Sequence, residues 1–421
     1  MRKRPFGASV LVTGVLLLSL AGIAFGAALT TQAPPPAGEP TVPGASYASG
    51  LGAPYLSTVG APRKLAGAGI GAIGGTLGRV AAAAGVKAGK AAGKKVKPLK
   101  LRVGYLDIIG GIESADRAHN SLRVAFKSLG TTWLYCDGQG TPTKWVTCGN
   151  SLLAQDIDVL AVTGIDPSTI PSVVQAAKAK KVPIVDFGGE VGPGYAAQFA
   201  PNEGKNGEIL AAYLKAKLAS QPGVSNIISI DYPAPWAQTR TAKLKAMVNA
   251  NSSKYKISVS ATSDPTNLIA GTQKTVSDAL TADPNVKAIW VSFDTAGQAA
   301  GQVVASKYPG KTFPNKPLVV TFHADPSTQL LMKKGGIDTV VDNNYDATAW
   351  ELADATAQFF ARKKAFPKYG NSFRYPGIGD PLSYEIVTAK NLPKGPRKYV
   401  APKVDVVTYF ITKWKTEGLI K

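Results

Sequence analysis

Apolar and polar positions follow two alternating patterns along the chain from about residue 100 onward. Continuous runs rich in Val, Ile and Leu alternate with segments in which apolar residues recur at helical spacing. In the first half this order predicts strands at Leu101–Ile108, Thr131–Asp137, Ile157–Gly164 and Val182–Gly189, and helices at Ser114–Leu129, Pro142–Ala154 and Ser168–Lys180. Continuous apolar strands alternating with helices are typical of a parallel sheet covered on both faces.

The second half repeats this pattern. It predicts strands at Asn226–Tyr232, Lys256–Ala261, Val286–Phe293, Pro317–His323 and Ile337–Asp342, and helices at Trp236–Asn249, Asn267–Ala282, Thr295–Ser306, a short segment ending at Lys334, and Ala347–Arg362. The Pro-, Gly- and Tyr-rich residues Phe366–Pro396 predict an irregular insertion, and Val404–Thr412 a last strand or crossover. Two successive α/β units indicate two similar lobes, whose ligands bind at the carboxyl ends of the strands.

The N-terminus reads as an export signal. Arg2, Lys3 and Arg4 precede an apolar run from Ala8 to about Leu29 that ends among small residues, which is the order of a signal peptide. The run is also long enough to span a bilayer, so residues 1–30 are either a cleaved signal peptide or a retained anchor. No Cys lies in the small-residue zone, which argues against a lipoprotein. We therefore expect an extracytoplasmic protein, in the periplasm or at the cell surface.

Positive charge is concentrated near the N-terminus. The chain carries 48 Lys and Arg against 27 Asp and Glu, and Glu39 is the one acid before Asp107. Residues 31–99 are rich in Pro, Gly, Ala and Lys, a composition that buries too little surface to fold. This linker is either a solvated spacer or an electrostatic contact for anionic lipid or cell-wall polymer. Gly69–Gly74 has the glycine spacing of a dinucleotide site but neither the preceding strand nor the following acid.

The two cysteines are Cys136 and Cys148. In an exported chain such a pair is more often a disulfide than two free thiols. Two Cys and two widely separated His do not make a zinc site, and the sequence predicts no metal and no cofactor. No nucleophile elbow or phosphate-binding loop is present, so we expect a protein that is not an enzyme.

Several motifs, taken together, resemble the type 1 periplasmic binding proteins of sugar ABC transporters, the ribose-binding group. They are Asp137-Gly-Gln-Gly-Thr-Pro-Thr-Lys144, Asp166, Lys181-Val-Pro-Ile-Val185, Arg240-Thr-Ala-Lys-Leu244 and Asp283-Pro-Asn-Val-Lys-Ala-Ile289. The resemblance covers about residues 100–412 and implies two Rossmann-like lobes with parallel sheets joined by a hinge. It assigns 100–201 and 344–384 to the N-lobe, and 202–343 and 385–421 to the C-lobe. The pair Cys136 and Cys148 is like one seen in some actinobacterial members.

The chain departs from the sugar binders where they grip hydroxyl groups. Their Asp-Arg pair after the fourth strand is replaced by Gly188 and Gly189, and their Asn after the third C-lobe strand by Phe293. The hinge-like Asn202 and Gly207 are spaced one residue further apart than in the family. The resemblance therefore implies the fold more firmly than it implies a sugar ligand.

Eight residues at the predicted strand ends are candidates for ligand binding. Arg240 offers a guanidinium to a carboxylate or hydroxyl pair, or else forms a surface salt bridge. Trp236 offers an aromatic plane for stacking, or else caps its helix. Asp294 is a ligand acceptor or an N-cap. The full set is Glu113, Thr163, Trp236, Arg240, Phe293, Asp294, His323 and Asn343.

The function that fits these features is an exported solute-binding protein. It would close two lobes around a small molecule, either a sugar-like or an aromatic one, and deliver it to the membrane permease of an ABC transporter. A receptor of the same fold that signals to a membrane partner, and a wall-associated secreted protein, are the alternatives; nucleic acid is not an expected partner. Replacing Arg240 by Ala is expected to weaken binding by roughly 30-fold or more while hardly changing the unliganded melting temperature.

Overall fold

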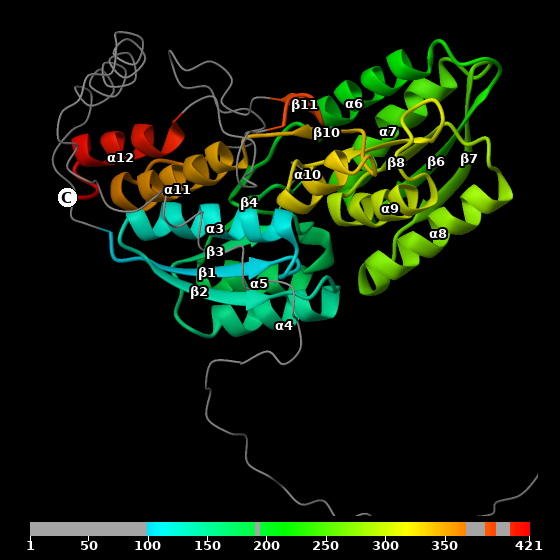
Figure 1. The fold of residues 1–421 in the computed structure, drawn as a ribbon. Coiled ribbons are helices and arrows are strands. Elements are labelled where there is room, and N and C mark those ends of the chain that lie inside the picture. Colours follow the sequence, from blue (N-terminus) through cyan, green and yellow to red (C-terminus); the bar gives the residue numbers. More distant parts are fainter. Residues whose placement is uncertain (1–98, 190–193, 368–383, 393–404) are drawn as a thin grey trace, which may run out of the picture. The chain divides into compact units, whose positions relative to one another are not determined.

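The computed structural model describes residues 99–189, 194–367, 384–392 and 405–421 (Figure 1). The predicted signal peptide or anchor and the linker up to residue 98 lie outside these ranges. The described residues form an α/β fold with two separate sheets, as the alternating pattern predicts. None of the helices in this part of the chain has the length and apolarity that a membrane span requires.

The first sheet is entirely parallel. Its strands run in the order β2-β1-β3-β4-β5, with the bounds β1 Arg102–Asp107, β2 Thr132–Asp137, β3 Val159–Thr163, β4 Ile184–Phe187 and β5 Ala197–Phe199. In register, Asp107 pairs with Asp137, and Thr163 with Phe187. All strands therefore end at one edge of the sheet.

Helices cover both faces of this sheet. Three of them share one core with Val103 and Tyr105 of β1: α3 Glu113–Ser128, α11 Tyr345–Arg362 and α12 Val406–Thr416. The opposite face, with Leu106, packs against α4 Pro142–Leu153 and α5 Pro171–Lys180, the latter preceded by the short helix η1 Pro167–Thr169. Figure 1 shows the two layers on either side of the strands.

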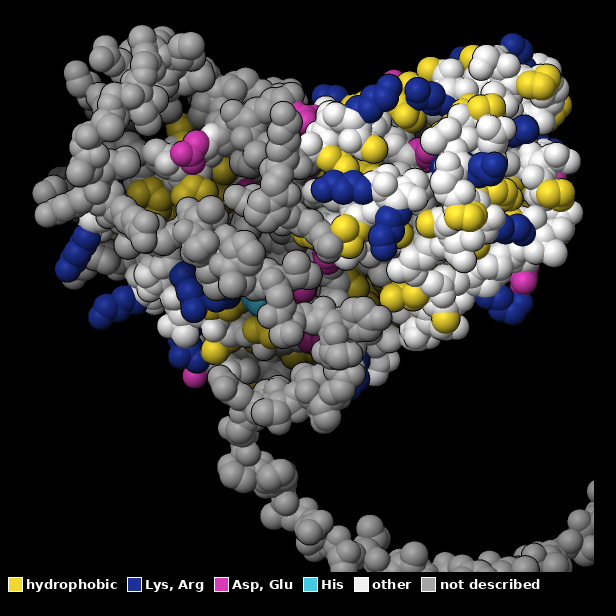
Figure 2. All heavy atoms as spheres, in the orientation of Figure 1, with side chains coloured by type: hydrophobic (Ala, Val, Ile, Leu, Met, Phe, Trp, Pro, Cys, Tyr) yellow, Lys and Arg dark blue, Asp and Glu magenta, His cyan; other side chains and the backbone are white. Residues whose placement is uncertain are grey.

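The second sheet has the order β11-β10-β9-β8-β6-β7, with only β11 antiparallel to its neighbour. The strands are β6 Ser225–Asp231, β7 Tyr255–Thr262, β8 Ala288–Val291, β9 Leu318–Phe322, β10 Thr339–Asp342 and β11 Glu385–Thr388. The helices are α6 Glu203–Leu218, α7 Pro235–Asn249, η2 Pro265–Asn267, α8 Leu268–Ala282, α9 Asp294–Lys307 and α10 Pro326–Lys333. In Figure 2, Lys and Arg side chains are spread over the exposed face of this lobe.

Four elements differ from the sequence predictions. Strand β5 and helix α6 lie in a stretch for which no element was predicted, and β11 lies in the predicted irregular insertion. The segment predicted as a final strand or crossover is the helix α12. Its buried residues recur at helical spacing, at Val406, Tyr409, Phe410 and Trp414, while the N-cap side chain of Asp405 accepts a hydrogen bond from the backbone N–H of Thr408.

The position of α12 also corrects the expected division into lobes. Its buried side chains belong to the core of the first sheet, where the rings of Trp350 and Trp414 stack 5.3 Å apart. Residues 405–421 therefore pack with the first lobe, whereas the resemblance placed 385–421 in the second. The strand β11 does pair with β10 in the second lobe.

Candidate ligand-binding cleft

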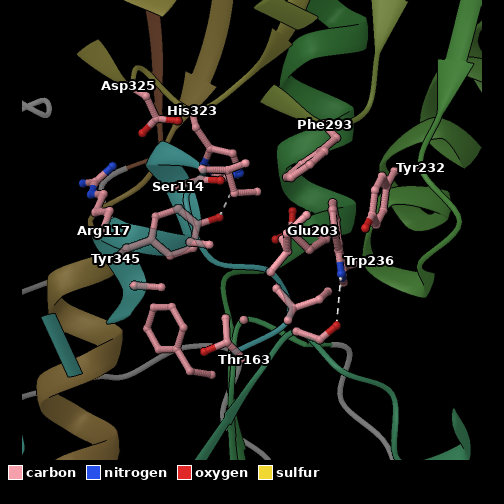
Figure 3. Close-up of a pocket in the computed structure, with 18 of the residues that line it drawn as sticks. Ser114, Arg117, Thr163, Glu203, Tyr232, Trp236, Phe293, His323, Asp325 and Tyr345 are labelled. Carbon is pink, nitrogen blue, oxygen red and sulfur yellow. Dashed lines mark hydrogen bonds between the residues drawn. The ribbon is translucent and has the colours of Figure 1, made fainter. Parts of the chain in front are cut away.

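A cavity with about 620 Å³ of space, its mouth included, lies at the strand ends of both lobes (Figure 3). The first lobe contributes residues from the loop after β1, from α3 and from the ends of β3 and β4. The second lobe contributes residues from the starts of α6 and α7 and from the loops after β6, β8 and β9. The lining residues are Ile108, Ile109, Ile112, Ser114, Ala115, Arg117, Ala118, Thr163, Gly164, Phe187, Gly188, Glu203, Tyr232, Trp236, Arg240, Phe293, His323, Asp325 and Tyr345.

The structure brings five of the eight predicted residues into this lining: Thr163, Trp236, Arg240, Phe293 and His323. The other three lie beside the cavity without lining it. Glu113 contacts Ser327 of the other lobe, Asp294 is buried next to Asp325, and Asn343 presents its backbone carbonyl to Arg117. Whether any of these residues binds ligand stays a prediction.

One end of the cavity is aromatic. The rings of Tyr232 and Trp236 stack 5.4 Å apart, and Phe293 lies 4.7 Å from Tyr232 and 5.5 Å from Trp236. The indole Nε1 of Trp236 donates to the carbonyl of Gly164 in the other lobe at 3.3 Å. Burial, with Asp294 nearby, raises the pKa of Tyr232 to about 12, so its hydroxyl is neutral. This end therefore presents flat apolar faces and one neutral hydroxyl.

The guanidinium of Arg240 is hydrogen-bonded to other residues of the protein. Glu203 accepts from its Nε at 2.6 Å and from its Nη2 at 2.9 Å, and the carbonyl of Ser292 accepts from Nη1 at 3.0 Å. The guanidinium lies between the rings of Trp236 and Phe322, at 5.0 and 4.4 Å. Burial disfavours its charged form, but the Glu203 carboxylate outweighs burial and keeps the pKa of Arg240 above its ordinary value.

The close packing of α6 against α7 brings the two residues of this ion pair together. Gly207 of α6 lies against the backbone of α7, and a Cβ at this position would stand 2.6 Å from the carbonyl oxygen of Arg240. Because a side chain does not fit there, only glycine lets the helices come this close. Glu203, one turn earlier, then reaches the guanidinium. Both side chains are almost fully buried, so the surface salt bridge considered for Arg240 is not what the structure shows.

His323 stands in an unusual backbone conformation at the end of β9. Its φ of 62° lies in the left-handed region, which non-glycine residues adopt rarely and often at functional sites. Its Nε2 lies 3.3 Å from Nη2 of Arg240 and 3.4 Å from the hydroxyl of Tyr345. Burial, together with Arg240 and Arg117, lowers the pKa of His323 well below 6.5. Since arginine only donates, Nε2 is the unprotonated, accepting nitrogen.

Arg117 joins the lobes at the opposite end from the aromatic cluster. Its Nη1 lies 3.2 Å from Oδ1 of Asp342 and its Nη2 donates to the carbonyl of Asn343 at 3.1 Å, while its guanidinium stands 5.5 Å from the ring of Tyr345. Burial raises the pKa of Asp342, and Arg117 opposes that shift. This is a buried ion pair between α3 of one lobe and β10 of the other.

Two carboxyl groups share the space next to Arg117. Asp325 lines the cavity, and the carboxyl group of Asp294 is buried next to it. Burial and the neighbouring Asp294 raise the pKa of Asp325 well above its ordinary value. A pair of buried carboxyls retains a proton between them because two adjacent negative charges are unfavourable at low dielectric. Asp294 is therefore a partner of Asp325 rather than a wall of the cavity.

The floor of the first lobe explains why glycines replace a charged pair there. The buried carboxyl group of Asp186, whose pKa burial raises to about 8, accepts from the backbone N–H groups of Gly164 at 3.2 Å and Gly189 at 2.9 Å. A Cβ at Gly189 would lie 2.1 Å from Oδ2 of Asp186, and Gly188 has a φ of 79°. This loop has no room for a side chain at 189 and favours glycine at 188, so it offers a ligand no charged group.

Glu113 forms hydrogen bonds between the two lobes at the rim of the cavity. Its carboxylate accepts from the backbone N–H of Ser327 at 2.9 Å and from its hydroxyl at 2.8 Å. Ser327 is in the first turn of α10, where backbone N–H groups lack helical partners. The predicted ligand acceptor is thus an acceptor for the facing lobe.

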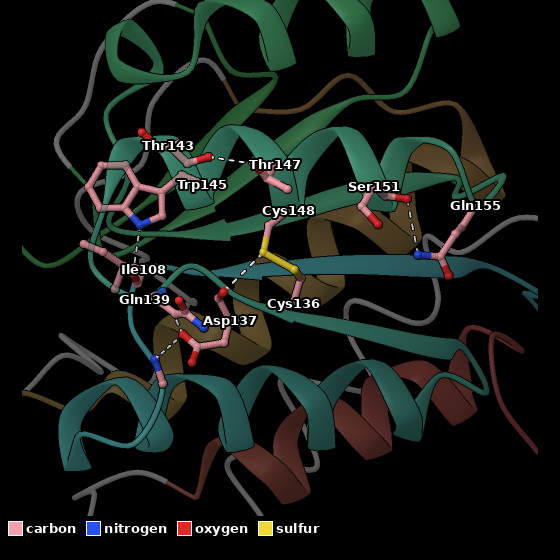
Figure 4. Close-up of a disulfide and its surroundings, with 11 residues drawn as sticks. Ile108, Cys136, Asp137, Gln139, Thr143, Trp145, Thr147, Cys148, Ser151 and Gln155 are labelled. Atoms are coloured by element: carbon pink, nitrogen blue, oxygen red, sulfur yellow. Dashed lines mark hydrogen bonds between the residues drawn. A yellow bond between two sulfur atoms is a disulfide. The ribbon is translucent and has the colours of Figure 1, made fainter. Parts of the chain in front are cut away.

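A disulfide lies beneath the loop after β1 (Figure 4). The structure joins Cys136 of β2 to Cys148 of α4, with an S–S distance of 2.00 Å. The neighbouring Asp137 accepts from the N–H of Gly110 at 2.8 Å, and the indole of Trp145 donates to the carbonyl of Ile108 at 2.8 Å. Both bonds hold the loop that carries Ile108, Ile109 and Ile112 into the cavity.

Several lining residues had not been singled out from the sequence. Glu203 is in the first turn of a helix that was not predicted, and an acid there has the ordinary explanation of favouring the helix dipole. Arg117 and Tyr345 are on helices whose buried faces look like core positions. Of these lining segments, only the loop Ile108–Ser114 could have been recognised from the sequence as part of a binding site, because it follows the first strand and is unusually apolar.

Comparison with known families identifies the fold. The profile described as "Periplasmic binding protein domain" matches residues 110–364, which is more than half of the chain. The chain belongs to the periplasmic binding protein family. The family comprises substrate-binding transport proteins rather than enzymes, and its members act outside the cytoplasm. The resemblance to the type 1 fold is thereby confirmed.

Solved structures show the same fold across the whole of their chains. A solute-binding protein of an ABC transporter from Mycobacterium smegmatis, with bound glycerol, has 18% identity and a TM-score of 0.60, covering 72% of this chain and 100% of that one. One from Burkholderia graminis in complex with D-arabinose has 17% identity and a TM-score of 0.60, covering 72% and 99%. One from Agrobacterium vitis with bound allitol has 15% identity and a TM-score of 0.60, covering 70% and 97%. No curated protein matches the sequence.

Proposed function

We propose that this protein is an exported solute-binding protein that captures a small molecule between its lobes and delivers it to the permease of an ABC transporter. The observation that carries the proposal is the cavity itself, which both lobes line at their strand ends. Export rests on the N-terminal signal pattern, and delivery rests on membership of the family. The solved relatives that hold glycerol, D-arabinose and allitol support a ligand of similar size.

The contacts between lobes support capture by closure. Glu113 reaches Ser327, Arg117 reaches Asp342, and Trp236 reaches the carbonyl of Gly164. These bonds surround the cavity and exist only while the lobes are together. A ligand that fills the cavity adds contacts to both lobes at once, so it favours the closed state by its differential affinity.

Closure is measurable with labels on the two lobes. Thr143 on α4 and Ala270 on α8 are exposed, and spin labels there, on a protein with its disulfide intact, report the distance between lobes. A screen of sugars, polyols and neutral, acidic and basic ring compounds by thermal shift supplies a stabilising compound. That compound is expected to shorten the distance and narrow its distribution.

A label pair within one lobe is the matched control. Thr143 and Gln175 both lie on exposed surfaces of the first lobe, and their distance should stay the same with and without the compound. If no compound in any class raises the melting temperature, or if a bound compound leaves the distance between lobes unchanged, the proposed capture mechanism is wrong.

A further inference from the structure

The two guanidinium groups that line the cavity are already paired within the protein. Arg240 is paired with Glu203 and Arg117 with Asp342, while Asp325 lies next to the buried Asp294, and burial raises the pKa of Asp325. All of these side chains are buried, so each pair is shielded from water and from exchange of partners. Among the described lining residues, neither guanidinium is left for an anionic ligand, and burial beside Asp294 disfavours a charge on Asp325 that a cationic ligand would need.

Two of the uncharged lining donors are also bonded within the protein. The hydroxyl of Thr163 bonds to that of Tyr105 at 2.6 Å, and the indole N–H of Trp236 bonds to Gly164. Among the described residues, the Tyr232 hydroxyl makes no hydrogen bond and remains available to a ligand. A ligand with hydroxyls on every carbon would lose water from each of them and regain few bonds, and an unmade hydrogen bond in a buried site is unfavourable.

The apolar surface of the cavity is continuous across the lobes. Ile112 of the first lobe packs against the cluster that holds Tyr232, Trp236 and Phe293. The methyl end of Ile108 and the indole of Trp236 meet at Gly164. Figure 3 shows this aromatic group on one side of the cavity and Arg117, His323, Asp325 and Tyr345 on the other. Stacked rings facing aliphatic side chains fit a flat ring between them.

We infer that the ligand is a neutral molecule built mainly of an apolar ring system, with a single hydroxyl or carbonyl group that bonds to Tyr232, and not a polyhydroxylated sugar. This inference rests on the proposed function and names the ligand class of the same cleft. The ring lies against Trp236 and Phe293 and is covered by the isoleucines of the loop after β1 when the lobes close.

A set of matched probes tests both the ring and its neutrality. Naphthalene-2-methanol is the neutral ring alcohol, 2-naphthoate and 2-naphthylmethylamine carry opposite charges on the same ring, and D-arabinose is the sugar. Calorimetric titration at two temperatures gives affinity and heat-capacity change. We expect the alcohol to bind at least about tenfold more tightly than the other three, with a negative heat-capacity change from apolar burial.

Two variants locate the binding. Phe293→Asn introduces a polar group at the aromatic end, and Ile109→Asn does so on a loop residue that is only half-buried and therefore affects folding little. Each should weaken binding of the alcohol by about tenfold or more. Ile269→Asn, on the exposed side of α8, is the control and should leave it unchanged.

The outcomes separate this inference from the proposed function. Tighter binding of D-arabinose or of a charged probe would overturn the neutral-ring inference and leave a solute-binding protein. Equal binding of the alcohol by all three variants would place the probe outside the cleft and overturn the inference too. If neither these probes nor the wider compound panel binds, both statements are wrong.

Discussion

The two ends of the cleft use buried side chains in opposite ways. At one end Arg117 and His323 are fixed by directed bonds to Asp342 and Tyr345, and Arg240, which also borders the ring of Trp236, is fixed by Glu203. At the other end Tyr232, Trp236 and Phe293 touch through ring faces and edges at 4.7 to 5.5 Å. Directed bonds fail when one partner is removed, whereas ring contacts tolerate changes of shape. The first end therefore sets the geometry of the cleft, and the second can adapt to what enters it.

The largest expected effect comes from breaking the Arg240–Glu203 pair. Arg240→Ala leaves the Glu203 carboxylate buried without its partner, which costs about 3–5 kcal/mol of unfolding free energy. This replaces the expectation from the sequence that the unliganded melting temperature would hardly change. Urea unfolding of the ligand-free protein measures the loss.

Two comparisons sharpen this result. The double variant Arg240→Met with Glu203→Leu removes both charges and should recover most of the lost stability, since apolar replacement of a buried pair is often neutral. At the aromatic end, Phe293→Leu should cost no more than about 1.5 kcal/mol. A loss at Phe293 as large as that at Arg240 would remove the distinction between the two ends.

A change outside both ends separates global stability from the cleft. Replacing Cys136 and Cys148 by Ser opens a short loop and should lower the unfolding free energy by about 3 kcal/mol. The distance between lobe labels should not change, because neither sulfur touches the cavity. Mass spectrometry of the unreduced protein should find no alkylatable thiol; two free thiols in protein from its native host would contradict the disulfide.

The rim contact should affect closure more than stability. Glu113→Ala removes the acceptor of two hydrogen bonds from Ser327. A hydrogen bond to a charged group contributes about 1.5–3 kcal/mol to the free energy of the state in which it forms. The closed fraction of the ligand-free protein should fall by roughly tenfold, as measured by the labels at Thr143 and Ala270. Glu208→Ala, on the exposed face of α6, is the control; an equal shift in both variants would mean that Glu113 has no specific role.

The smallest effect is a dependence on pH that belongs to the bonded end. In the folded protein the pKa of His323 lies well below 6.5, so the unfolded chain takes up a proton as pH falls through about 6.5 and the folded protein does not. Stability is therefore lost toward acid, by up to about 1.4 kcal/mol per pH unit for one proton. His119, whose pKa is lowered to about 4 by burial and Arg123, acts in the same direction.

His323→Asn should flatten this dependence. Asn tolerates the left-handed backbone better than most residues, so the variant keeps the local fold. Unfolding free energies between pH 7 and about 5 should fall less steeply than in the unchanged protein, by one proton's contribution. Parallel curves for the two proteins would mean that His323 titrates normally.

The sequence predicted the strands that are buried on both faces and the helices between them, because their pattern is strong and local. It failed where local preference and tertiary packing disagree. The segment Val404–Thr412 is rich in β-branched residues, which favour strands, yet a core formed by distant residues selects the helix α12. The strand β11 is a short antiparallel edge, and such edges carry little pattern of their own.

For the cleft, the sequence showed which residues lie at strand ends, but it did not show which side chains form ion pairs or hydrogen bonds with one another. Thr163, Trp236, Phe293 and His323 follow strands or begin helices, and the structure brings them together. Arg240 was singled out for its place in the family motif, but its partner Glu203 precedes it by 37 positions on a helix of weak amphipathicity. The ion pair becomes visible only in the structure, where the close packing of α6 on α7 at Gly207 brings Glu203 to the guanidinium of Arg240.

The packing of α12 has a consequence for how the two lobes are joined. The chain starts in the first lobe, enters the second through α6, returns through α11, pairs β11 with the second sheet and ends with α12 in the first. The first and last described elements, β1 and α12, thus both pack in the first lobe, and the second lobe is formed by residues between them. Because the described chain passes from one lobe to the other more than once, a nick in one of these crossings leaves the two lobes covalently connected through the others.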